Sequence, residues 1–433
     1  MNKREKNLAK MRKRNMRLYP IYKTLSWDYL FFYTINFLFL TQVKHISAAN
    51  VVLVDAFYAI FGIIAQIPAA IIINFCGRKK SIIIANFINC LYMLVIIFSR
   101  YFTDLILAEI LSALAFAIKQ SAEPSLLNES IPRATFKDKI FAKINEKGLS
   151  GYYIINSITM LLSGWFFEIN PYIPIILSLT VNILVTLMSK GFIEPVQKKK
   201  QSIKEFSIRK NIKDLEDSLK FILKSERLKS LLLFAAIFNG MIVTLINCET
   251  SLLEEMKLSS AAIGIIAAVF GLLAGITTRK QEYFNSKFKN KSLGVIGITV
   301  GISTILAGIL AMFTDQWRWI IIIVVIALSV RSLFKGIFYN LEEKYCRNFA
   351  NEEIDSKIYI SRDFVVSIAS AIAGVYASFL LERISSAWTM VIFGISNLIL
   401  IIIALVYMKS RIGLKPEEYS EEERKYDELK NIK

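Results

Sequence analysis

Ionisable side chains inside long apolar stretches are the residues of this chain that could do chemistry. Lys119 and Glu123 lie four positions apart in "AFAIKQSAEPS", and Arg331 and Lys335 have the same spacing in "SVRSLFKG". Residues four apart share one face of a helix, so we expect Lys119 and Glu123 to pair. A charge in a hydrocarbon environment costs about 2.5–3.5 kcal/mol, which makes all four residues candidates for binding a solute or for gating.

The two cations Arg331 and Lys335 repel each other and therefore need a counter-charge. The sequence offers Glu123, Asp28 and Asp55, and a chloride ion or an anionic substrate would also serve. A desolvated carboxylate can bind and release a proton, so Asp55, Glu123 and Asp28 are candidates for carrying protons. Asp28 lies at the beginning of its apolar stretch, where a helix-capping role is the alternative.

Polar side chains within the apolar stretches are candidates for contact with a solute. Tyr33 and Asn36 lie in the first stretch, and Asn239 and Asn247 lie in the seventh. Most of the 30 Phe and 18 Tyr residues would simply face lipid or pack between helices. A few would line a cavity.

Other chemistries have little support in the sequence. The chain has a single histidine, His45, and four cysteines without paired spacing, so no metal site, cofactor site or disulfide framework is predicted. No glycine-rich loop of the GxxxxGK[ST] type occurs, which argues against energy from nucleotide hydrolysis. We therefore do not expect an enzyme.

The hydropathy pattern predicts an all-α integral membrane protein. The chain has 433 residues, of which 55% are hydrophobic, and its mean hydropathy is +0.48. The apolar residues form continuous blocks of roughly 17–25 residues, the length that crosses a bilayer as a helix. We predict twelve transmembrane helices, at about 25–42, 50–74, 81–99, 103–128, 148–168, 171–190, 230–249, 259–278, 292–313, 316–339, 360–381 and 387–408.

The distribution of Lys and Arg predicts the orientation. With alternate links on alternate sides and the N-terminus inside, 45 of the 53 Lys and Arg residues fall on one side and five on the other. Cations accumulate on the cytoplasmic side, so both termini are expected in the cytoplasm. The net charge of +18 then reflects topology and not a nucleic-acid partner. We expect the basic N-terminal arm, residues 1–24, to touch anionic lipid.

The longest polar stretch divides the chain into halves. We expect a six-helix bundle over 25–190, a cytoplasmic linker with an amphipathic helix over 191–229, a second six-helix bundle over 230–408 and a charged cytoplasmic tail over 409–433. The two bundles are weakly similar in sequence, and pseudo-repeated halves are typical of transporters.

A short basic link follows the second predicted helix. Residues 70–79 read "AIIINFCGRK", and Gly77, Arg78 and Lys79 match the end of the motif Gly-x-Leu-[Ala/Ser]-Asp-Arg-x-Gly-Arg-[Arg/Lys]. The chain thereby resembles the major facilitator superfamily (MFS), with Asn74 where that family has a carboxylate. The resemblance implies that this loop helps gate the protein and that the first, fourth, seventh and tenth helices line a central path. The alternative is a loop that serves only topology.

The resemblance implies a secondary transporter that works by alternating access. Proton-coupled efflux of amphiphilic drugs or metabolites is the leading expectation, although the fifth helix lacks the Gly-Pro-x-x-Gly-Gly patch of many antiporters. Proton-coupled uptake or exchange of an anionic metabolite is the alternative. A non-transporting membrane sensor is a third possibility. The partners expected are a small-molecule substrate, protons and membrane lipids, for a monomer in the plasma membrane of a bacterium whose genome is AT-rich.

Overall fold

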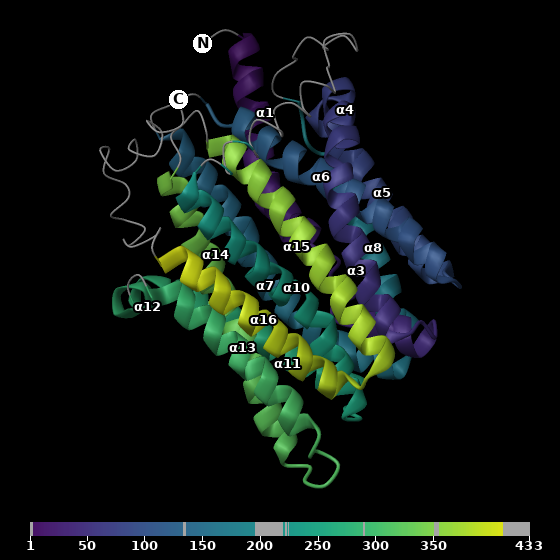
Figure 1. The fold of residues 1–433 in the computed structure, drawn as a ribbon. Coiled ribbons are helices and arrows are strands. Elements are labelled where there is room, and N and C mark those ends of the chain that lie inside the picture. The colour runs from purple at the N-terminus through teal and green to yellow at the C-terminus, as the bar shows by residue number, and fades with distance from the viewer. Residues whose placement is uncertain are drawn as a thin grey trace. The chain divides into compact units, whose positions relative to one another are not determined.

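The computed structural model describes residues 3–132, 136–194, 220, 223, 225–288, 291–349 and 355–409 (Figure 1). Within these ranges every regular element is helical. The predicted amphipathic helix of the linker and nearly all of the C-terminal tail lie outside the described residues.

Described helices cover eleven of the twelve predicted spans, and in the first, 25–42, only the two ends are helical. In chain order they are α1 (Lys3–Ser26), α2 (Asn36–Leu38), the π-helix η1 (Phe39–Val43), α3 (Ala48–Ile64), α4 (Gln66–Cys76), α5 (Arg78–Phe98), α6 (Phe102–Ser130), α7 (Lys137–Ile169), α8 (Tyr172–Ser189), α10 (Glu226–Glu255), α11 (Ser260–Arg279), α12 (Gln281–Phe288), α13 (Ser292–Ala311), α14 (Ile320–Phe349), α15 (Asp355–Arg383) and α16 (Ser386–Lys409).

Eight of the described helices are long and apolar enough to cross a membrane. A ninth span is obtained if α3 and α4, which bend by 47° at their junction, count as one. Helices α6 and α7 are not among them. Twelve crossings with both termini in the cytoplasm therefore remain a prediction.

The first predicted span is interrupted where the sequence suggests a continuous helix. Helix α1 ends at Ser26, residues 27–35 form turns, and Phe31 has a left-handed backbone with φ of 68°. The Asp28 carboxylate accepts a hydrogen bond of 2.8 Å from the Tyr29 N–H. Short polar side chains that bond to nearby backbone compete with helical hydrogen bonds, which explains why the helix ends here. Interrupted helices at membrane depth are common where transporters bind solutes.

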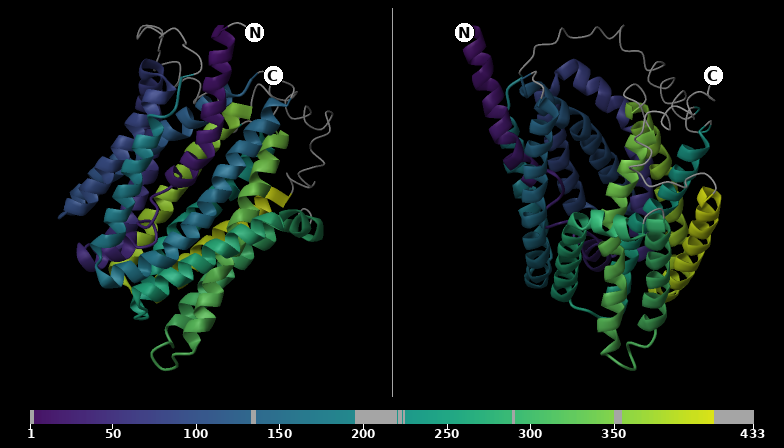
Figure 2. Two further views of the ribbon diagram at one scale, coloured as in Figure 1. Left: turned by 180° about the vertical axis from the view of Figure 1, so that it is seen from behind. Right: turned by 90° about the vertical axis from the view of Figure 1, so that its left-hand side faces the viewer.

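The chain divides into two compact units. Unit 1 comprises residues 1–46, 60–207 and 260–268, and unit 2 comprises residues 47–59, 208–259 and 269–433. Within unit 1, α5 packs between α6 and α8, α1 packs on α7, and α4 packs on α6 (Figure 2). Within unit 2, α10 packs on α15 and α16, and α13 packs on α14 and α16. Division into bundles at 25–190 and 230–408 remains a prediction.

Small residues allow the helices of unit 2 to approach closely. A Cβ atom on Gly308 of α13 would lie 2.7 Å from the carbonyl oxygen of Ala387, and one on Gly240 of α10 would lie 2.9 Å from that of Ala369. Such backbone contacts are the usual way in which membrane helices associate.

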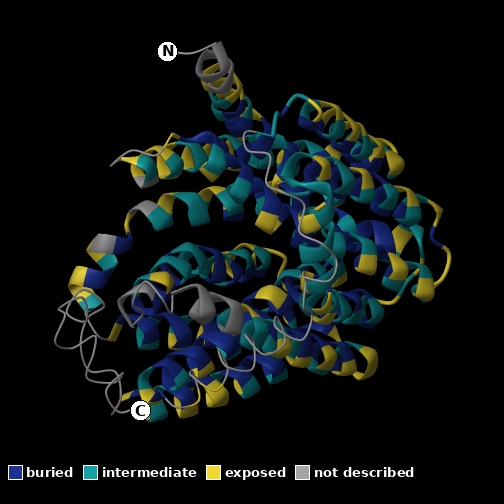
Figure 3. Ribbon diagram, turned by 90° about the horizontal axis from the view of Figure 1, so that it is seen from above, coloured by how far each residue is buried: buried dark blue, intermediate teal, exposed yellow. Residues whose placement is uncertain are grey.

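The outer faces of the helices carry large apolar side chains. Ile176 and Leu184 of α8, Ile322 of α14 and Val406 of α16 are all exposed. Figure 3 shows buried and exposed positions alternating along the helices. Because the buried faces pack against other helices, these exposed apolar faces are suited to lipid.

Candidate functional site

A buried carboxylate lies at the centre of a polar cluster in unit 1. Glu123 of α6 is 1% exposed, and its Oε2 atom lies 2.7 Å from Nζ of Lys23 on α1. The Tyr22 hydroxyl donates a 2.9 Å hydrogen bond to the other carboxylate oxygen, and the Asn86 amide on α5 donates to the Tyr22 oxygen. An ion pair with additional hydrogen bonds is the arrangement that makes buried charges tolerable. Three helices therefore meet at one titratable group.

Lys119 does not pair with Glu123, so that expectation was wrong. Its ammonium group instead donates to the carbonyl oxygen of Ser26, the last residue of α1, and lies 5.0 Å from the centre of the Phe116 ring. The last carbonyls of a helix lack partners and carry partial negative charge, so a cation is favourable there. Lys23, from α1, takes the place beside Glu123 because the packing of α1 on α6 brings it closer.

The interrupted segment of the first span places further polar groups in unit 1. Besides its bond to Tyr29, Asp28 accepts a 3.2 Å hydrogen bond from the Tyr152 hydroxyl on α7. Tyr33 is 42% exposed. The side-chain oxygen of Asn36 is buried and has no hydrogen-bond partner among the described residues. Asp28 thus bonds to the backbone just beyond α1 and to α7, while Asn36 retains an acceptor for a solute donor.

In unit 2, Arg331 of α14 forms a two-point ion pair with Glu249 of α10. The Nε–Oε1 and Nη2–Oε2 distances are both 2.6 Å, and both side chains are buried. The structure thus gives Arg331 a carboxylate partner that is not among the acids expected from the sequence, namely Glu123, Asp28 and Asp55. The positive charge of Lys335 also acts on Glu249.

Sequence reasoning missed Glu249 because the predicted seventh span ended at that residue. Helix α10 continues to Glu255, so the carboxylate lies within the helix and not at its end. Its presence in "INCETS", directly after an apolar run, was the available signal.

A second carboxylate of unit 2 contacts the same helix. Half-buried Asp55 of α3 accepts a hydrogen bond from the Asn247 amide of α10, two residues before Glu249. Asn239 is buried and donates to its own helix, at the Ala235 carbonyl. Asn247 and Asp55 are thus brought together, whereas the hydrogen bond of Asn239 stays within its own helix.

The basic loop after α4 is held by two carboxylates that the sequence did not suggest. Gly77 joins α4 to α5 with φ of 77°, and Glu194 accepts hydrogen bonds of 3.2 and 2.8 Å from the N–H groups of Arg78 and Lys79. The Arg78 guanidinium lies 2.7 Å from Glu129 of α6. Carboxylates are stabilising at a helix N-terminus, where N–H groups are unpaired.

Asn74 is exposed and takes no part in this arrangement. The carboxylate missing from the family motif is thus replaced, within unit 1, by acids from the end of α6 and from beyond α8. Sequence reasoning missed both carboxylates because they lie 51 and 116 positions from Arg78 along the chain.

The described residues contain no group of three or more His, Cys, Asp or Glu side chains that could hold a metal ion. All four cysteines are free thiols.

Long helices with lipid-suited outer faces and buried ion pairs define a multi-pass membrane protein. The sequence model of the Major Facilitator Superfamily matches residues 25–353, and the chain belongs to this family. The resemblance noted at the basic loop is thereby confirmed. The comparison with curated protein sequences gives no match.

Solved structures of transporters share the fold. The nucleoside transporter NupG is similar with a TM-score of 0.68 and 12% identity, over 92% of this chain and 99% of that one. A bacterial homologue of the human lysosomal transporter Spinster has a TM-score of 0.63 and 14% identity, over 97% and 98%. A POT family transporter in complex with 5-aminolevulinic acid has a TM-score of 0.62 and 12% identity, over 94% and 96%. Likeness at these identities shows the fold alone.

Proposed function

We propose that this chain is a secondary active transporter that exports amphiphilic small molecules across a bacterial plasma membrane, coupled to protons. The observation that carries the proposal is the buried Glu123, which is held by Lys23 and Tyr22 where α1, α5 and α6 meet. Protonation of Glu123 would remove the charge that binds Lys23 and loosen α1 against α6. Alternating access would follow from movement of two six-helix halves in a monomer with twelve spans.

The balance of charge supports an amphiphilic substrate. Glu249 neutralises Arg331, and Lys23 neutralises Glu123, so these cations are not available to attract an anion. Asn36, with its unused acceptor, and the exposed Tyr33 supply polar and aromatic contact beside the interrupted helix. This combination suits a mostly apolar solute with a few hydrogen-bond donors.

Exchange of an anionic metabolite is the second candidate, and Lys119 favours it. This buried cation contacts a backbone carbonyl and no carboxylate among the described residues. An anionic solute could replace the Ser26 carbonyl as its partner.

The basic loop would act as part of the gate. Glu194 and Glu129 hold Gly77, Arg78 and Lys79 in place, and loss of these contacts would free the junction of α4 and α5. Asp55, whose carboxylate accepts a hydrogen bond from Asn247, would serve as a second proton carrier. Asp28 is the third candidate.

Proton flux in proteoliposomes tests the proposal. The purified chain is reconstituted with a pH-sensitive dye inside, a pH gradient is imposed, and amphiphiles, organic anions, nucleosides and short peptides are added in turn. The variants are Glu123→Gln and Asp55→Asn. The matched control is Glu382→Gln, which removes a carboxylate that is 72% exposed.

Amphiphile-dependent proton movement that is lost in Glu123→Gln and kept in Glu382→Gln would support the proposal. Flux with organic anions alone, abolished by Lys119→Met, would favour the second candidate. Solute flux without proton movement would contradict proton coupling, and no flux with any solute would favour a sensor.

A further inference from the structure

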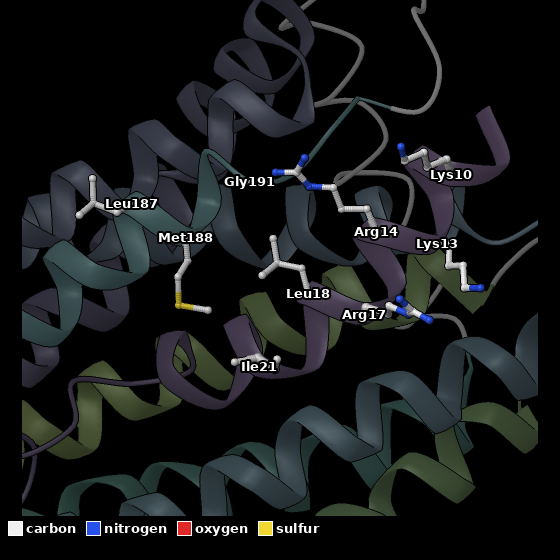
Figure 4. Close-up of a pocket in the computed structure, with 9 residues that line it drawn as sticks. All are labelled: Lys10, Lys13, Arg14, Arg17, Leu18, Ile21, Leu187, Met188 and Gly191. Carbon is white, nitrogen blue, oxygen red and sulfur yellow. The ribbon is translucent and has the colours of Figure 1, made fainter. Parts of the chain in front are cut away.

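A pocket between α1 and α8 lies apart from both polar clusters. Its volume is about 610 Å³, and it lies entirely within unit 1 (Figure 4). It is lined by three successive turns of α1 and by the end of α8. Nothing in the transport proposal uses it.

One part of the pocket is strongly cationic. Lys10, Lys13, Arg14 and Arg17 line it, and no acidic residue that the structure describes does. None of the four cations forms an ion pair with an acidic side chain in the part of the chain that the structure describes. These cations follow one another over three turns of α1, and such a row of positive charge attracts an anion.

The other part of the pocket is apolar. Leu18 and Ile21 of α1 face Leu187 and Met188 of α8. Ile21 is 58% exposed and Leu187 is 53% exposed. Leu187 belongs to an apolar helix that ends at Ser189 and is able to cross the membrane, so the apolar part continues the lipid-suited face of α8.

Gly191 keeps the two parts connected. A Cβ atom there would lie 3.0 Å from the Leu18 side chain and 3.6 Å from a guanidinium nitrogen of Arg14. Figure 4 shows Arg14 beside Gly191, with Leu18 below it. A side chain at position 191 would occupy the space where the cationic and apolar parts meet.

We propose that this pocket binds an anionic phospholipid. The phosphate lies among the four cations, and an acyl chain follows Leu18, Ile21 and Leu187 along α8. A soluble phosphate compound would use the cations but would gain nothing from the exposed apolar side chains, so the combined chemistry selects a lipid. This inference does not depend on transport, and its test can succeed or fail independently.

Native mass spectrometry of the full chain in a neutral detergent tests the proposal. The protein is titrated with phosphatidylglycerol or with phosphatidylcholine of the same acyl chains. The pocket variant is Arg14→Gln with Arg17→Gln. The matched control, Lys143→Gln with Lys147→Gln, removes two exposed cations of α7. Arg14→Lys with Arg17→Lys keeps the charge.

Wild type should bind phosphatidylglycerol at least tenfold more tightly than phosphatidylcholine. The pocket variant should lose about 30-fold in affinity for phosphatidylglycerol, the effect of two cations near a headgroup. The lysine variant and the α7 control should bind as wild type. Equal binding of the two lipids, unchanged binding in the pocket variant, or displacement by millimolar glycerol phosphate would each overturn the proposal.

Discussion

Glu249 and Arg331 are 82 positions apart in the sequence and are joined by two parallel hydrogen bonds of 2.6 Å between α10 and α14. Both side chains are almost wholly buried. The pair neutralises Arg331, a buried cation of α14, and ties two helices of unit 2 together. It therefore bears on the stability of unit 2.

Removing one partner of this pair should be costly. Arg331→Gln or Glu249→Gln leaves an uncompensated buried charge, and we expect each to lower the free energy of unfolding by about 3–5 kcal/mol. Thermal unfolding in detergent measures the effect. The double variant should recover part of the loss because neither charge remains.

The exposed pair Lys257–Asp315 provides the contrast, since its charged atoms lie 3.9 Å apart and its side chains are 71% and 80% exposed. Lys257→Gln should leave the midpoint of thermal unfolding nearly unchanged. Single variants of Glu249 or Arg331 that melt like the wild type would show that the buried pair is not formed in the membrane protein.

Neutralising Glu123 should separate solute movement from the pH gradient. Gln at this position keeps an oxygen that can accept from Tyr22 but cannot exchange a proton. We expect Glu123→Gln to retain solute exchange at equal pH. The rate of uptake driven by the pH gradient should fall at least tenfold. Counterflow and gradient-driven assays on the same vesicles measure the two rates. Loss of both, with a normal melting midpoint, would instead indicate that Glu123 contacts the solute.

The backbone of Gly77 should resist substitution. Its φ of 77° is costly for any residue with a Cβ, so Gly77→Ala should destabilise the chain by about 1–2 kcal/mol. Thermal unfolding again gives the value. Gly62→Ala is the matched control, because a Cβ at this helical glycine meets nothing within 4 Å and alanine favours a helix. Equal effects at the two positions would contradict the assigned backbone strain.

Glu194 should stabilise the start of α5. Glu194→Ala removes the acceptor for the N–H groups of Arg78 and Lys79, and we expect a loss of about 1–2 kcal/mol. Hydrogen exchange of these two amides should accelerate in the variant. Glu146→Ala removes an exposed acid of α7 and should leave both amides protected. Unchanged exchange in Glu194→Ala would mean that the cap is not formed.

The positions of the helices were predictable because length and apolar character are local properties. Each predicted span from 50–74 to 387–408 coincides with a described helix or with the bent pair α3 and α4. The basic loop indicated the family because "GRK" after an apolar run is also a local signal. The interruption at residues 27–35 was not predictable from hydropathy, because the stretch is apolar enough to be a helix and the hydrogen bond between Asp28 and the backbone beside it leaves no mark on hydropathy.

The sequence alone determined which residues carry charge inside apolar helices, and therefore which groups need partners. Only the tertiary structure decided which residues are those partners. Lys119 and Glu123 share a helical face. Because α1 packs on α6, however, Glu123 pairs with Lys23, and Lys119 donates to the Ser26 carbonyl. Arg331 finds Glu249 because α10 and α14 pack together. The pairing of buried charges depends on distances between helices, and helical periodicity along one segment contains no information about those distances.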